Sequence, residues 1–271
     1  MARTTLDIEN MSRYWRITQR VLAKSLASFQ ERGMVGTCRH LLFNFPEVLH
    51  NYVSGDPTDD PSGVEFDRLH NTDTGGRIEL VHFNITTPNF AYGVRYHGTG
   101  PALAREMIER LAIEFEKFTF VDFGSGKGRV LLVASEFPFR KIVGVEFAPE
   151  LCEIARNNIK RFQNSAQQCT DFEILCLDAV SYAIPETPAV LYFFNPFGRE
   201  VMARVAESVC ASLQRRPREV YVIYYNPVCA SVWDETGFFQ EIYSEAACRT
   251  YMSSLSARKD NVFLSRDGMK E

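Results

Sequence analysis

Three glycines at alternate positions, Gly124, Gly126 and Gly128, make up the stretch of this sequence best suited to binding a small molecule. Glycine adopts positive φ without steric cost, and because it lacks a Cβ a ligand can approach its backbone closely. Residues 118–123 precede them and are apolar and aromatic, as in a buried strand. Residues 130–137 follow and read as a helix. A strand, a glycine turn and a helix in this order predict a nucleotide-type site with exposed backbone N–H groups.

The glycine spacing is G-x-G-x-G, because Arg129 stands where the dinucleotide fingerprint G-x-G-x-x-G has its third glycine. This difference argues against NAD or FAD. A tight turn between strand and helix, with no ligand, is the alternative interpretation.

Two acidic residues follow later strand-like segments. Glu146 ends segment 141–146, 20 positions after Gly126, and Asp178 follows segment 172–177. A carboxylate at the end of the second strand can accept hydrogen bonds from both ribose hydroxyls of a nucleoside. Asp178 is placed to accept from an exocyclic amino group such as that of adenine. A solvated strand-end carboxylate is the alternative for each residue.

These residues require a sheet that gathers them at one edge. Strand-like and helix-like segments alternate, which predicts an α/β fold with a mostly parallel sheet and helices on both faces. Ligands of such sheets bind outside the carboxyl ends of the strands, where the glycines, Glu146, Asp178 and Asn195 all fall. The expected strands are 118–123, 141–146, 172–177, 189–194 and 219–225, with two weaker candidates at 238–243 and 261–265. The expected helices are 102–116, 130–137, 149–162 and 199–213.

The chain before residue 100 has a different character. Residues 1–50 carry a helical pattern of apolar residues, residues 54–64 have a loop composition, and residues 66–76 are polar and rich in turn formers. We expect residues 1–99 to form a helical N-terminal extension with an acceptor-side or lid region, and residues 100–271 to form the cofactor-binding domain. Asp67, His70 and Asp73 could form a metal cluster, but solvated loop side chains are the preferred interpretation, and no metal site is predicted.

The composition limits the class of protein. The net charge of −4 gives no case for a nucleic-acid partner or an anionic membrane surface, and no apolar run has the length of a membrane span. Seven dispersed cysteines without a CxxC pair argue against structural zinc and favour a reducing, cytoplasmic location.

Taken together, the motifs resemble those of the class I S-adenosylmethionine-dependent methyltransferases, over roughly residues 100–265. Residues 121–129 (VDFGSGKGR) resemble the first motif of that superfamily, 143–146 (VGVE) its second, and 177–179 (LDA) its adenine-side motif. The resemblance implies a Rossmann-like, doubly wound, mostly parallel seven-stranded sheet that binds S-adenosyl-L-methionine.

The resemblance also implies roles for single residues. Asp122 would help to fix the methionine amino group, and Phe147 and Ala179 would flank the adenine ring. The methionine portion would face the glycine loop, of which we assign Gly124, Ser125, Gly126 and Gly128 to cofactor binding. Tyr96 and Thr99, ahead of helix 102–116, would cover the methionine end, as in a branch that includes protein-lysine enzymes. A plain helix-capping turn is the alternative for these two residues.

Asn195, Pro196 and Phe197 are similar to the Asn/Asp-Pro-Pro-aromatic motif of amino-group methyltransferases. In that motif a side-chain oxygen and a backbone carbonyl hold the target nitrogen, so that its lone pair faces the methyl group, and an aromatic ring packs beside it. This chain has one proline instead of two, and Gly198 takes the usual place of the aromatic residue. A strand terminator followed by a core phenylalanine is the alternative.

We therefore predict an enzyme that transfers a methyl group to nitrogen, on a protein lysine or a small-molecule amine. An O- or C-methyltransferase of a small metabolite, with a structural Asn195, and a non-catalytic cofactor-binding protein are the alternatives. His97 is a candidate general base, but no base is assigned. The acceptor itself and the oligomeric state are left open.

Overall fold

The computed structural model describes residues 61–76, 89, 93, 98–245 and 247–254. These residues belong to the second of two units into which the chain divides, Met1–Thr58 and Asp59–Glu271. The expected N-terminal helix, Tyr96, His97 and the strand candidate 261–265 lie outside the described residues. The division at residues 99 and 100 stays a prediction.

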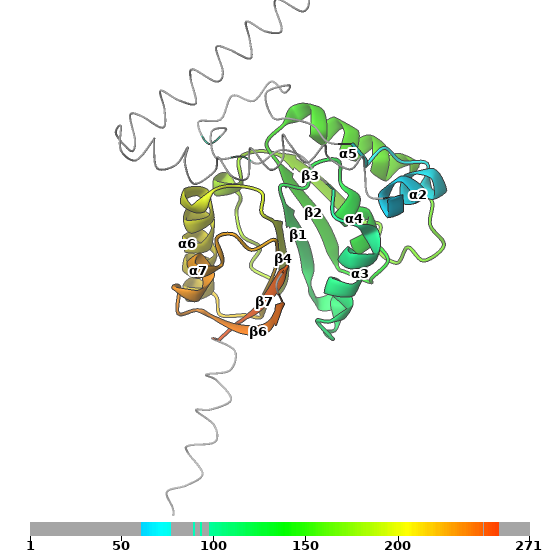
Figure 1. Ribbon diagram of the computed structural model, residues 1–271. Coiled ribbons are helices and arrows are strands. Elements are labelled where there is room, and N and C mark those ends of the chain that lie inside the picture. The colour runs from blue at the N-terminus through cyan, green and yellow to red at the C-terminus, as the bar shows by residue number, and fades with distance from the viewer. Residues whose placement is uncertain (1–60, 77–88, 90–92, 94–97, 246, 255–271) are drawn as a thin grey trace, which may run out of the picture. The chain divides into compact units, whose positions relative to one another are not determined.

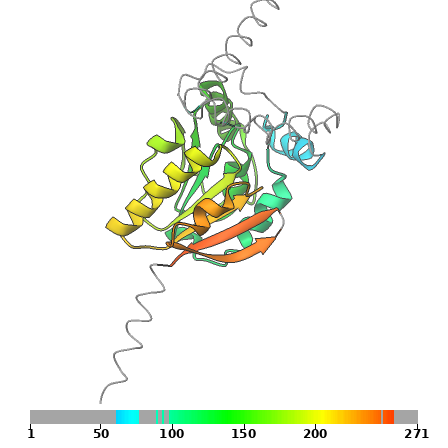
Figure 2. The same ribbon diagram turned by 60° about the vertical axis from the view of Figure 1, so that its left-hand side comes forward.

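Seven strands form one sheet in the order β3-β2-β1-β4-β5-β7-β6 (Figure 1). The first five strands pair in parallel, whereas β7 runs antiparallel to both β5 and β6. Figure 2 shows the orange and red β6–β7 hairpin along one edge of the sheet. The strands are β1 (Thr119–Phe123), β2 (Lys141–Glu146), β3 (Phe172–Cys176), β4 (Ala189–Phe194), β5 (Val220–Tyr225), β6 (Phe239–Glu245) and β7 (Cys248–Ser253). A mostly parallel α/β sheet is confirmed, and the mixed edge is part of it.

Helices cover both faces of this sheet (Figure 1). Helices α6 (Arg199–Arg215) and α7 (Ala230–Asp234) lie on one face, and α3 (Pro101–Glu109), α4 (Arg129–Ala134) and α5 (Pro149–Arg161) on the other. Side chains of a strand point alternately to its two faces. Along β4, Leu191 and Phe193 therefore join the core under α6, whereas Val190 and Tyr192 join the core under α3 and α4. Burial on both faces explains the continuous apolar runs of the central strands.

The short helix α7 was not predicted, and α4 ends at Ala134 instead of residue 137. Three other elements differ from the sequence prediction. Helix α3 ends at Glu109 instead of continuing to residue 116, because the backbone turns into the left-handed region at Ala112 (φ 48°). Strand β7 was missed, because Arg249 and short polar side chains interrupt its apolar pattern.

The third difference is helix α2 (Pro61–His70), which replaces the loop expected around residues 61–64. Pro61 occupies its first position, where the missing N–H of proline costs nothing. The rings of Phe66 and His70 pack on Phe162 at the end of α5, with centroid distances of 6.0 and 5.0 Å. This tertiary contact, more than the local sequence, holds the helix.

Gly144 in the middle of β2 lies where side chains of α4, β3 and the glycine turn are closely packed. A Cβ at this position would lie 2.7 Å from Leu131 Cδ1, 2.8 Å from Ser125 Oγ and 2.9 Å from Ile174 Cδ1. We expect Gly144→Ala to lower the free energy of unfolding by about 1–3 kcal/mol through overpacking. Urea denaturation measures this change.

The exposed Ile242 on β6 provides the control, since Ile242→Ala should change stability by no more than about 0.5 kcal/mol. Equal stability of Gly144→Ala and the wild type would show that the layer has room for a methyl group.

Candidate functional site

The glycine turn connects β1 to α4 and lies against the end of β4. Gly124 has φ of 78°, and a Cβ added to it would lie 2.6 Å from Pro196 Cβ. Only glycine meets both conditions, because another residue would be strained in φ and would collide with the proline. The turn and the Asn-Pro segment after β4 are therefore in direct contact, as the predicted site requires.

Glu146 lies at the end of β2 and braces the same turn. Its two carboxylate oxygens accept hydrogen bonds from the N–H groups of Gly126 and Ala148, both at 2.9 Å. The side chain is buried, with 4% exposure. Burial raises the pKa of this carboxyl above its ordinary value, and the backbone N–H donors oppose the rise. The predicted ribose contact of Glu146 stays a prediction.

Asp122, the fourth residue of β1, is the second buried acid beside the turn. It is 3% exposed, and within the described part of the chain no group donates a hydrogen bond to its carboxylate. Burial raises the pKa of Asp122 well above 3.8, and the charge of Glu146 raises it further. A buried carboxylate without a donor is costly, so this position favours a cationic donor supplied by a ligand.

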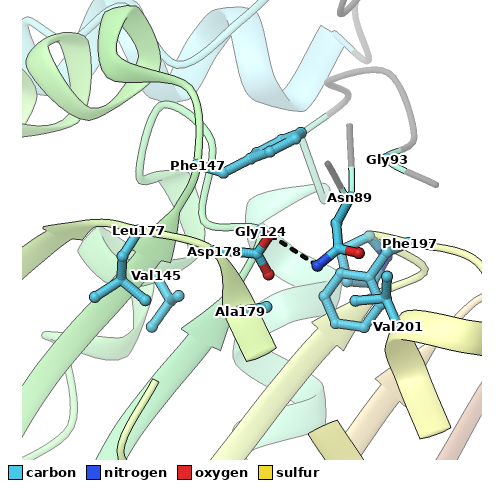
Figure 3. Close-up of a pocket in the computed structure, with 11 residues that line it drawn as sticks. Asn89, Gly93, Gly124, Val145, Phe147, Leu177, Asp178, Ala179, Phe197 and Val201 are labelled. Atoms are coloured by element: carbon cyan, nitrogen blue, oxygen red, sulfur yellow. Dashed lines mark hydrogen bonds between the residues drawn. The ribbon is translucent and has the colours of Figure 1, made fainter. Parts of the chain in front are cut away.

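A mostly apolar pocket opens beside the turn, between the carboxyl ends of the strands (Figure 3). Its lining includes six of the predicted site residues, which are Gly124, Phe147, Asp178, Ala179, Pro196 and Phe197. The structure thus brings together residues from three predicted motifs. Asp122, Ser125, Gly126, Gly128, Glu146, Thr99 and Asn195 are not among the lining residues.

Asn89 and Gly93 also line this pocket, and neither was among the predicted site residues. Asn89 Nδ2 donates to Asp178 Oδ2 at 2.9 Å (Figure 3), and Gly93 forms an antiparallel bridge with Phe197. The second oxygen of Asp178 accepts from the Val180 N–H at 3.0 Å. The carboxylate of Asp178 is therefore oriented by two amide donors at the position predicted for adenine.

The segment after β4 is shaped by a left-handed asparagine. Asn195 has φ of 37°, and its Oδ1 lies 3.5 Å from the hydroxyl of Tyr224 on β5. That distance is the long limit of a hydrogen bond, so the amide oxygen is only weakly engaged. The Phe197 ring is 7% exposed and packs edge-on against Phe193, so it belongs to the core and to the pocket wall together.

Three further predicted residues, Ser125, Thr99 and Gly128, are not among the residues that line the pocket. Ser125 is buried, and its Oγ has no hydrogen-bond partner among the described residues. Thr99 is 2% exposed and shares a 2.8 Å hydrogen bond with the hydroxyl of Tyr192, which buttresses the sheet next to Asp122. Gly128 caps α4 with φ of 87°. Their cofactor contacts stay predictions.

Hydrogen bonds close the loop that carries the candidate metal ligands Asp67, His70 and Asp73. Asp67 accepts hydrogen bonds from the Thr72 hydroxyl and from the backbone of Thr74 and Gly75, which closes the loop on itself. The described residues contain no group of three or more His, Cys, Asp or Glu side chains that could hold a metal ion. Among the helices that the structure describes, none has the length and apolar character needed to cross a membrane.

Comparison with known proteins agrees with this geometry. A family model described as "Histone methylation protein DOT1" matches residues 81–172, about a third of the chain, including the glycine turn and Glu146. This match confirms the resemblance to methyltransferases, and the seven-stranded sheet fits their class I superfamily. No match to a curated protein was found.

Several solved structures are similar at low identity. A ribosomal protein L11 methylase from Lactobacillus delbrueckii subsp. bulgaricus is 14% identical, with 58% of this chain and 79% of that chain covered and a TM-score of 0.42. An RNA methyltransferase from Salinibacter ruber in complex with S-adenosyl-L-homocysteine is 21% identical, with 58% and 92% covered and a TM-score of 0.40.

Human N-acetylserotonin methyltransferase in complex with SAM is 14% identical, with 56% of this chain and 51% of that chain covered and a TM-score of 0.38. The names of these proteins refer to protein, RNA and small-molecule substrates, so they do not decide an acceptor. They also give no support to the expectation that a nucleic-acid partner is unlikely.

The raised pKa of Asp122 predicts how stability depends on pH. A carboxyl whose pKa is higher in the folded than in the unfolded state binds its proton more tightly when folded. Stability is therefore lost as the pH rises from the ordinary value of 3.8 through the raised value. Asp122→Asn removes this loss, so we expect its melting temperature to exceed that of the wild type at about pH 8 and the difference to shrink toward about pH 5.

Calorimetric melting of the ligand-free protein checks this expectation, with Asp171→Asn, an exposed acid beside β3, as the matched control. A difference between Asp122→Asn and wild type that does not vary with pH would contradict it.

Proposed function

We propose that this chain is an S-adenosyl-L-methionine-dependent methyltransferase whose acceptor atom is a nitrogen. The observation that carries the proposal is the pair of buried carboxylates, Asp122 and Glu146, beside a turn of three positive-φ glycines. Burial and the charge of Glu146 both raise the pKa of Asp122, and a positive charge beside Asp122 would oppose that rise. S-adenosyl-L-methionine carries both an ammonium and a sulfonium group, and so meets that requirement.

The residues present fit this cofactor. Asp122, which lacks a donor in the described structure, would hold the amino group, and Glu146 retains unused lone pairs for ribose hydroxyls. Phe147 and Ala179 give the pocket apolar walls for a planar base, and Asp178 would accept from its amino group. The cofactor supplies an electrophilic methyl group on sulfur.

The preference for nitrogen rests on Asn195. Its weakly engaged amide oxygen stands next to two pocket residues, Pro196 and Phe197. An acceptor oxygen there can take an N–H bond of the substrate and turn the nitrogen lone pair toward the methyl group, which is catalysis by orientation. The name of the family model that matches residues 81–172 supports a protein amine within this class.

One observation favours the second candidate, an O- or C-methyltransferase. Tyr224 contacts the Asn195 amide and also accepts from the Cys229 N–H at 3.2 Å, so it links the turns after β4 and β5. An asparagine held in the left-handed region by such a link can have a purely structural role in the turn, without contacting the substrate. Turnover of a variant distinguishes the two candidates.

Cofactor binding is the first test. We expect calorimetry to show binding of S-adenosyl-L-homocysteine to the wild type, and Glu146→Ala to weaken it by about 2–3 kcal/mol, because charged hydrogen bonds to the ligand and to the turn are lost. Glu153→Ala, an exposed acid on α5, should bind as the wild type does. Absence of heat with a folded wild-type sample would refute the proposal.

The second test concerns the acceptor. Wild-type protein and labelled cofactor are incubated with cell lysate, and label is counted in the protein and small-molecule fractions. We expect Asn195→Ala to lower label transfer by about 100-fold or more while cofactor affinity changes little, because orientation acts on the reacting nitrogen. Unchanged transfer by Asn195→Ala would favour the O- or C-methyltransferase.

A further inference from the structure

The glycine turn carries two cations, Lys127 and Arg129, that are both buried and that are not among the residues lining the pocket. Lys127 Nζ donates to Asp73 Oδ1 at 2.8 Å and to the Gly75 carbonyl at 2.7 Å. Its side chain is 7% exposed, whereas that of Asp73 is 64% exposed. The turn is therefore anchored from its outer side to the loop that follows α2.

Arg129 makes fewer hydrogen bonds than Lys127, and its Nη2 has no hydrogen-bond partner among the described residues. Its Nε donates to Thr74 Oγ1 at 2.8 Å, and Asp67 Oδ2 lies 4.0 Å from its Nη2. The guanidinium is enclosed by two glycines, since a Cβ on Gly63 or on Gly98 would lie 2.5 or 2.8 Å from Nη1. Buried charge of this kind persists only where partners are fixed, and here those partners belong to the segment around α2.

Asn158 on α5 completes the attachment. It is 1% exposed, its Oδ1 accepts from the Asp73 N–H at 2.8 Å, and its Nδ2 donates to the carbonyls of Asp73 and Lys127, both at 2.9 Å. One amide thus joins the loop to the backbone of the glycine turn. Asp67 in turn fixes the shape of that loop through Thr74 and Gly75.

We propose that residues 63–75, together with Lys127, Arg129 and Asn158, form a clamp that positions the glycine turn for cofactor binding. This inference rests on the proposed function. A turn of three glycines has high conformational entropy, and ordering it on binding would weaken affinity. The clamp fixes the outer side of the turn while Glu146 fixes Gly126 from the inner side, so the N–H groups are ordered before the ligand arrives.

Gly63→Ala is the sharpest test, because two effects oppose each other. Gly63 lies inside α2, where helix propensity alone makes alanine stabilising. The clamp predicts the opposite effect, a loss of order in the glycine turn. The added methyl group displaces the Arg129 guanidinium, and Gly98 on its other side leaves no room for the guanidinium to move. We expect at least a tenfold rise in the Kd for S-adenosyl-L-homocysteine, and at least tenfold faster amide hydrogen exchange at Gly126–Arg129 in the ligand-free protein.

Val64→Ala is the matched control, since Val64 is the neighbouring residue and is 54% exposed. It should leave both quantities within twofold of wild type. In an Arg129→Met background, Gly63→Ala should add less than twofold, because the methyl group no longer meets a guanidinium. Asp73→Asn is a milder second variant, which removes the charge that faces Lys127 and should raise both quantities in the same direction.

Melting curves establish that each variant is folded, so that a lower melting temperature with unchanged Kd and unchanged exchange counts against the clamp. Folded Gly63→Ala and Asp73→Asn variants within twofold of wild type in both quantities would overturn it. A wild type that does not bind S-adenosyl-L-homocysteine would refute the proposed function. The amide exchange rates of Gly126–Arg129 in the variants would still show whether the clamp orders the turn.

Discussion

Buried charge on both sides of one glycine turn is the constraint on which the rest of this structure depends. Asp122 and Glu146 belong to β1 and β2, whereas Lys127 belongs to the turn and Arg129 begins α4, and all four residues are buried. The desolvation of a charged group costs several kcal/mol unless partners replace water. Lys127 Nζ and Arg129 Nε donate to the segment that follows α2, whereas Arg129 Nη2 and the Asp122 carboxylate have no hydrogen-bond partner among the described residues. The turn is therefore attached to the α2 segment, while the negative charge of Asp122 is left without a donor.

The sequence predicts the buried central sheet better than the elements held by tertiary contacts. The central strands were predicted to within about a residue, because a parallel strand buried on both faces is written as a continuous apolar run. The positions of Glu146 and Asp178 at the ends of strands were predicted from the sequence, since each comes at the end of such a run. Strand β7 and helix α2 could not be found in the same way, because tertiary contacts stabilise them more than local pattern does.

The pocket shows the same limit. Asn89 is 89 positions from the Asp178 that it contacts, and nothing in its neighbourhood in the sequence indicates that contact. Lys127 and Arg129 did carry a signal, since two cations inside an apolar strand-turn-helix segment require acids from elsewhere, and Asp67 and Asp73 lie upstream. The sequence showed these acids as loop residues, and the structure shows them as counter-charges.

The clamp also bears on the order in which the molecule can fold. The hydrogen bonds that join Asp73, Thr74 and Gly75 to Lys127, Arg129 and Asn158 span 52 to 85 positions, and Asn158 is the last of the partners to be synthesised. Contacts of such sequence separation close long loops, whose entropy must be overcome before the contact contributes. The parallel sheet core can assemble from nearer neighbours, such as β1 with β2. We therefore expect the glycine turn to reach its cofactor-binding conformation late in folding, in a step separate from formation of the sheet.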